Sequence, residues 1–131
     1  MQGYANSEDE KARAEIDEVL KVIRKVVPEK PNLYNLYAEN VLANILTKTG
    51  EAERAEKLMR EIIASYPKLL ESPNADIATA KKSLGETLIA QKKIAEAIQI
   101  LTESEKEFVE SVGENNPQTK KCRELLASIK S

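Results

Sequence analysis

A repeat of 42 residues constrains the fold of this chain more than any other feature. Asparagines recur at Asn32, Asn74 and Asn116, and each lies 42 residues after the one before it. The same step joins three further series: Ala38, Ala80 and Cys122; Leu42, Leu84 and Leu126; Ala43, Gly85 and Ala127. A fixed period of about 20 to 50 residues marks a stack of units, because one such unit cannot bury its apolar face alone. The sequence therefore predicts a stacked-repeat fold.

Each unit is predicted to begin with a helix that follows its asparagine. An asparagine at this position accepts a hydrogen bond from an unpaired N–H group of the first helical turn. Pro117 follows Asn116 directly and takes the first helical position, where its missing N–H has no cost. Apolar residues at spacings of three and four then predict the buried face of the first helix: Ala38, Leu42, Ile45, Leu46 and Thr49. Gly50 can end this helix in the left-handed conformation.

A second helix in each unit is predicted to start near Glu51 and again near Ile94. Its buried face is Ala52, Ala55, Leu58, Met59, Ile62, Tyr66 and Leu70 in the first unit, and Ile94, Ala97, Ile100, Leu101, Phe108 and Val112 in the second. Pro67 has no N–H to donate, which predicts a kink or an early end in the first copy. Gly113 is expected to end the second copy.

The two ends of the chain hold incomplete units. Ser7 and Glu10 form a capping-box pattern, which predicts a lone second helix with the apolar stripe Ala12, Ile16, Val19, Leu20, Ile23 and Val27. At the other end, a lone first helix turns Cys122, Leu125, Leu126 and Ile129 toward the stack. We predict an all-α fold of about six helices. Its parts are a flexible segment at 1–6 and one domain at 7–131, divided into a second helix (7–30), two repeats (31–73 and 74–115) and a first helix (116–131).

These motifs resemble the tetratricopeptide repeat family, which pairs Leu-Gly-x-x-Tyr in the first helix with Ala-x-x-x-Phe in the second and closes with proline. The first unit has Leu42-Ala43-x-x-Leu46, Ala55-x-x-x-Met59 and Pro67, and the second has Leu84-Gly85-x-x-Leu88 and Ala97-x-x-x-Leu101. The resemblance implies a right-handed superhelical stack of antiparallel helix hairpins. Small Ala43 and Gly85 then allow the paired helices to approach closely.

The chain also departs from the common form of this repeat. Glu39 and Lys81 replace the large aromatic residue that usually opens the first-helix motif, and Lys92 replaces the glycine that Gly50 supplies in the first unit. The period of 42 residues exceeds the usual length of about 34. In this respect the chain resembles the longer subtype found in kinesin light chains.

The resemblance implies a protein-interaction module that holds a peptide or helical segment of a partner in a groove lined by the first helices. The candidate groove residues lie opposite the buried faces at about 100° per residue: Tyr37, Asn40, Asn44, Thr47, Lys48, Thr79, Lys82, Glu86, Ile89 and Lys121. Asn40 and Asn44 lie one turn apart, and each amide can donate to and accept from a peptide backbone. A solvated polar face is the alternative interpretation of these residues.

The composition excludes much catalytic and metal chemistry. The chain has no histidine, which removes the Ser-His-Asp and Cys-His catalytic arrangements and the commonest metal ligand. Its one cysteine, Cys122, cannot form an internal disulfide, and its periodic partners are alanines, so we expect a small buried residue. We predict that the protein is not an enzyme and uses no cofactor and no metal.

Charge and hydropathy patterning bear on partners and location. Twenty Lys and Arg residues against 22 Asp and Glu give a net charge of −2, which does not favour nucleic acid as a partner. No apolar stretch approaches the roughly 20 residues that cross a bilayer, so we predict no membrane insertion. A lone thiol without an export signal predicts a cytoplasmic location.

Two functions are compatible with these sequence features. The first is binding of a protein or peptide partner, which the sequence does not identify. The second is structural self-association, or a spacer role, in which the terminal helices pair with copies and form a homo-oligomer. The incomplete units at the two ends motivate the second, because terminal repeats otherwise need polar outer faces.

Overall fold

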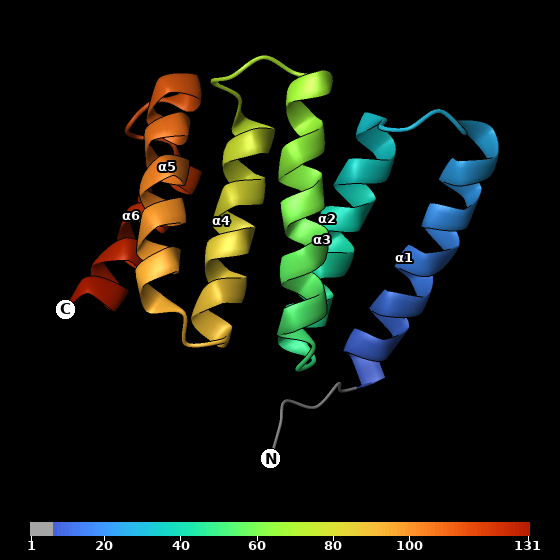
Figure 1. Cartoon of the computed structure of the whole chain (residues 1–131), viewed down its shortest axis with the longest axis horizontal. Coiled ribbons are helices and arrows are strands. Elements are labelled where there is room, and N and C mark those ends of the chain that lie inside the picture. The colour runs from blue at the N-terminus through green and yellow to red at the C-terminus, as the bar shows by residue number, and fades with distance from the viewer. Residues whose placement is uncertain (1–6) are drawn as a thin grey trace.

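The computed structural model describes residues 7–131 as a row of helices. Within that range six α-helices occur, and no strand: α1 (Ser7–Val26), α2 (Leu33–Lys48), α3 (Ala52–Ser65), α4 (Ala75–Ala90), α5 (Ile94–Val112) and α6 (Pro117–Lys130). The helices follow one another across the molecule in chain order, with α2 behind α3 and α6 behind α5 (Figure 1). The predicted all-α stack is confirmed. The segment at 1–6, for which the sequence predicts flexibility, lies outside the described residues.

The three periodic asparagines begin the first helices, as predicted. Asn32, Asn74 and Asn116 are the N-caps of α2, α4 and α6, and each side-chain oxygen accepts a hydrogen bond from a backbone N–H group in the first turn. For Asn74 the distance to the backbone nitrogen of Asp76 is 2.7 Å. Pro117 takes the first position of α6. The repeat therefore fixes where three of the helices start.

Replacing Asn74 with alanine is expected to lower the free energy of unfolding by about 1 kcal/mol, because two N–H groups of α4 lose their acceptor. Asn74→Asp is the matched control, since aspartate caps a helix as well as asparagine does. Urea unfolding followed by circular dichroism measures both changes. Equal loss of stability in the two variants would show that the cap is not the cause.

The helix ends also follow the sequence. Gly50 and Gly113 have φ angles of 87° and 90°, in the left-handed region that glycine adopts without strain. Lys92 takes the place of Gly50 in the next repeat and has the same kind of conformation, with φ at 63°. Before Pro67, α3 stops at Ser65 and continues only as the 3₁₀ turn η1 (Tyr66–Lys68), which confirms the predicted early end.

The core is built where first and second helices cross at small residues. Gly85 on α4 packs against Leu101 on α5, and a Cβ atom added at Gly85 would lie 2.5 Å from Leu101 Cγ. Ala43, Ala55 and Ala97 are fully buried at the corresponding crossings. The close approach predicted from the motif is therefore present in both hairpins.

The predicted apolar faces are wrong at the two ends of α5 and along much of α1. Ile94 and Val112 lie at the two ends of α5 and are exposed, unlike the middle of the helix. On α1 only Leu20 of the predicted stripe is buried, while Val19 is 45% exposed. The physical reason is that α1 packs chiefly against α2, whereas α3 is flanked by both α2 and α4.

Candidate functional site

The part of the candidate groove on α2 combines exposed and half-buried polar side chains. Tyr37 and Lys48 are exposed, whereas Asn40 and Asn44 are half-buried. The Asn40 side-chain oxygen is buried, and no donor among the described residues reaches it. A buried acceptor without a donor costs stability, so a rotation of the amide that turns this oxygen toward a donor would be favoured.

The part on α4 and α6 is charged. Lys82 Nζ lies 3.8 Å from the Glu86 carboxylate one turn later, and the Lys82 side chain is only 18% exposed. Thr79 is exposed and donates its hydroxyl to the carbonyl oxygen of Ala75 in its own helix. Lys121 is exposed on α6. Of these four candidate residues on α4 and α6, Lys82 and Glu86 lie close to each other.

Two of the candidate residues take part in packing. Thr47 Oγ1 lies 2.8 Å from Thr87 Oγ1, and this contact joins α2 to α4. Ile89 is half-buried and packs against the core cluster. Pattern alone places both side chains on the open side of their helices, but Thr47 contacts the next repeat and Ile89 packs against the core.

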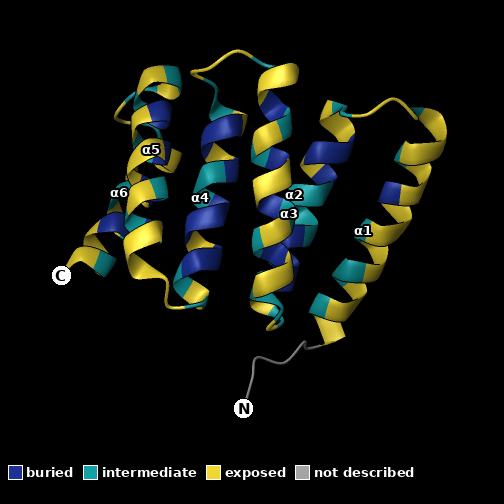
Figure 2. Cartoon of the chain, viewed as in Figure 1, coloured by how far each residue is buried: buried dark blue, intermediate teal, exposed yellow. Residues whose placement is uncertain are grey.

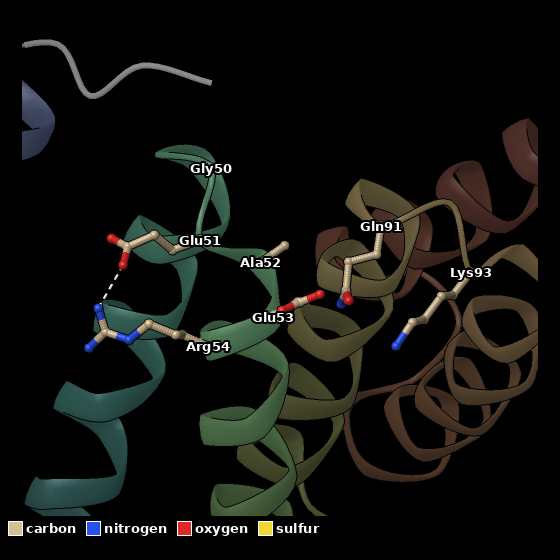
Figure 3. Close-up of a pocket in the computed structure, with 7 residues that line it drawn as sticks. All are labelled: Gly50, Glu51, Ala52, Glu53, Arg54, Gln91 and Lys93. Atoms are coloured by element: carbon tan, nitrogen blue, oxygen red, sulfur yellow. Dashed lines mark hydrogen bonds and ion pairs between the residues drawn. The ribbon is translucent and has the colours of Figure 1, made fainter. Parts of the chain in front are cut away.

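A polar hollow opens between the ends of the two repeats, and its seven lining residues are drawn in Figure 3: Gly50, Glu51, Ala52, Glu53, Arg54, Gln91 and Lys93. The Arg54 side chain points toward Glu51 (Figure 3). The Glu51 carboxylate accepts hydrogen bonds at 2.6 Å from both Arg54 and Arg13. These bonds hold the pKa of Glu51 below its usual value, the Arg54 bond having the largest effect. Within the hollow, Glu51 and Arg54 are therefore already paired.

Glu56 on α3 forms a second paired site beside this hollow. Its carboxylate accepts from Lys93 Nζ at 3.0 Å, from Gln91 Nε2 at 2.8 Å and from Arg60 Nε at 2.9 Å. Burial acts to raise the pKa of Glu56, but the three hydrogen bonds outweigh it and lower the pKa to about 2. Glu56 thus ties α3 to the turn between α4 and α5.

The most buried acidic residue is Glu107 on α5, which the repeat pattern does not single out. Its carboxylate accepts from Ser72 Oγ at 2.7 Å, from the Asn74 backbone N–H at 2.9 Å and from Lys81 Nζ at 3.0 Å. Burial acts to raise its pKa, and these hydrogen bonds together with the Lys81 charge lower it. The sequence signal for Glu107 is Lys81, which stands where the repeat motif usually has a large aromatic residue. A lysine at this packed position needs an acidic partner nearby.

Cys122 is fully buried in α6, as predicted, and its thiol lies 3.5 Å from the Leu101 carbonyl oxygen. Burial raises the pKa of this thiol, so the thiolate form that a nucleophile needs is disfavoured. The residue is a small core group at the position that Ala38 and Ala80 take in the repeats.

Comparison with known families agrees with this geometry. Residues 40–76, from the middle of α2 through α3 to the start of α4, match the family model of the tetratricopeptide repeat. Residues 40–76 are thus similar to a tetratricopeptide repeat. Tetratricopeptide repeats indicate a protein–protein interaction module and are typically non-catalytic. Membership in the longer subtype stays a prediction.

The sequence finds no match in a search of curated proteins. No helix of residues 7–131 is long and apolar enough to cross a membrane. Over the same residues, no group of three or more His, Cys, Asp or Glu side chains is placed to hold a metal ion.

Proposed function

We propose that this tetratricopeptide domain binds a peptide or helical segment of a partner protein across its first helices α2, α4 and α6. The contact surface, here called the first-helix face, consists of Tyr37, Asn40, Asn44, Lys48, Thr79, Lys82, Glu86 and Lys121, with Thr47 and Ile89 packed at its base. We also keep the division into repeats at 31–73 and 74–115 as part of this proposal.

The observation that carries the proposal is the pair of amides on α2. Asn40 and Asn44 lie one helical turn apart, and the buried Asn40 oxygen lacks a donor among the described residues. An amide that rotates about its terminal bond can present either a donor or an acceptor to a peptide backbone. Such contacts hold an extended segment without requiring one particular side chain.

The charges on α4 support a partner of mixed charge. Lys82 and Glu86 offer one positive and one negative group within a single turn. Because the Lys82 side chain is mostly buried, an acidic group that reaches it is less screened by solvent than at an exposed lysine. We therefore expect acidic residues in the bound segment near Lys82.

The first-helix face is tested by selecting peptides from a random library on the wild-type domain and measuring their affinity for two variants. The first variant carries Asn40→Ala, Asn44→Ala and Lys82→Glu. We expect it to bind the selected peptides at least about tenfold more weakly, a loss of about 1.4 kcal/mol. Circular dichroism checks that both variants remain folded.

The control variant carries Lys57→Glu, Gln99→Ala and Thr102→Ala, three exposed positions on the second helices α3 and α5. We expect it to bind the peptides as the wild type does. Equal binding by the first variant and the wild type would contradict the proposal and move the site to another surface.

A further inference from the structure

An apolar groove lies between α1 and α2, outside the buried core. Its lining includes Ile16, Val19 and Ile23 from α1 and Tyr34, Tyr37 and Val41 from α2. Apart from the two tyrosine hydroxyls, these side chains carry no group that can form a hydrogen bond.

The exposed apolar surface of the described residues is concentrated around this groove. Six of the nine large exposed apolar side chains lie on α1 and the first two turns of α2: Val19, Val22, Val26, Leu33, Tyr34 and Tyr37. Val26 is 72% exposed and Tyr34 is 69% exposed. In Figure 2, α1 forms the right-hand end of the row and is mostly exposed. A cluster of exposed apolar side chains of this kind indicates an interaction surface.

The internal repeat shows what belongs in the groove. One repeat later, α2 packs on α4, where Ser83 and Thr87 are buried and Thr87 contacts Thr47 of α2. The positions 42 residues earlier are Val41 and Ile45 on α2. Ile45 is buried, but Val41 is only half-buried and lines the groove. At Val41 the groove therefore lies where a helix packs one repeat later.

The other end of the stack does not fit this groove. The outward side of α6 carries Lys120, Glu124 and Lys130, all exposed, and no large apolar side chain on α6 is exposed. If α6 of one copy packed on the α1–α2 groove of another, these charges would be buried against Val19 and Tyr34. Burying a charge without an opposite charge or a hydrogen-bond partner is costly. The apolar face formed by α1 and α2 is therefore better suited to packing against another apolar face than against α6.

We propose that this face pairs with the same face of a second copy of the chain, with α1 of each copy antiparallel to α1 of the other in the groove. The first turn of α1 is acidic, with Glu8 and Glu10, and its last turn is basic, with Arg24 and Lys25. An antiparallel pair places the acidic end of one copy beside the basic end of the other, whereas a parallel pair places like charges together. The result is a two-fold symmetric dimer.

The test is the molar mass of the whole chain in solution, measured by light scattering over a range of concentrations. We expect the wild type to reach twice the chain mass of 14.6 kDa. Val22→Lys with Val26→Lys is expected to give a monomer with an unchanged circular dichroism spectrum, because both side chains are exposed in the single chain. Leu69→Lys with Val112→Lys, at exposed apolar positions elsewhere, is the matched control and should remain dimeric.

Reversal of the end charges tests the antiparallel arrangement separately. Glu8→Lys with Glu10→Lys makes both ends of α1 basic, and Arg24→Glu with Lys25→Glu makes both ends acidic. We expect each variant alone to be monomeric and an equal mixture of the two to form a dimer. A wild type that stays monomeric at all concentrations, a dimer that survives Val22→Lys with Val26→Lys, or a mixture that does not associate would each overturn the proposal.

Discussion

Gly85→Leu is expected to lower the free energy of unfolding by about 3 kcal/mol or more, the upper part of the range for overpacked cores. A Cβ atom at this position would lie 2.5 Å from both Cγ and Cδ2 of Leu101. Leu101 is fully buried, so its side chain has no free space to move into. The helices α4 and α5 would have to separate, and their contact is the most extensive between any two helices of the described residues. Urea unfolding monitored by circular dichroism measures the loss.

Ala127→Leu is the matched control for this prediction. Ala127 lies 42 residues after Gly85, at the same position of the repeat, but it is exposed because no second helix of the described residues packs on it. We expect its substitution to change the stability by less than about 0.5 kcal/mol. Similar losses in both variants would mean that the helix itself, and not the crossing with Leu101, disfavours leucine here.

The helix boundaries could be predicted from the sequence because the signals that set them are local. Asn74 caps α4 through N–H groups two and three residues away, and Pro67 ends α3 through its own missing N–H. The small residue Gly85 is equally informative, because the repeat places it opposite a second helix. Local chemistry repeated at a fixed step thus identifies the fold.

The buried charges could not be predicted because they depend on residues that are distant in sequence and differ between the repeats. Lys81 on α4 is paired with Glu107 on α5, whereas its counterpart Glu39 on α2 is half-buried. Burial is the main cause that raises the pKa of Glu39, while the Asn35 side chain and the charges of Lys30 and Arg24 act to lower it. The same repeat position therefore carries a lysine with an acidic partner in one unit and a half-buried glutamate with a raised pKa in the other.

The candidate site was predictable only in part for a related reason. Helical periodicity gives the face on which a side chain lies, but not how neighbouring helices cross. Thr47 forms a hydrogen bond with Thr87 because α2 packs against α4, and Tyr37 lines the groove between α1 and α2. The apolar groove itself had a sequence signal, because Val22 and Val26 lie beside Val19 of the predicted stripe and make the apolar face of α1 wider than α2 covers.

Glu107→Ala is expected to lower the free energy of unfolding by about 3 kcal/mol, because it leaves the Ser72 hydroxyl, the Asn74 N–H and the Lys81 ammonium group without their acceptor. The control is Glu103→Ala. Glu103 approaches the same lysine at 3.8 Å, but its side chain is 51% exposed, so we expect a change within about 0.5 kcal/mol. Equal losses of stability in the two variants would mean that Glu107 contributes no more than an exposed ion pair does.

The stabilising effect of Glu107 should also depend on pH. The pH dependence distinguishes the contribution of the carboxylate charge from that of side-chain packing. Its pKa is lower in the folded chain than in the unfolded one, so its contribution is complete above the unfolded value near 4.5 and is lost as the pH falls through the folded value. Glu107→Gln keeps the shape but has no charge to lose. Its stability deficit against the wild type should therefore be full at neutral pH and shrink in acid, as unfolding at a series of pH values would measure. A deficit that stays constant down to the acid range would mean that packing, and not the carboxylate charge, holds the α3–α4 connection against α5.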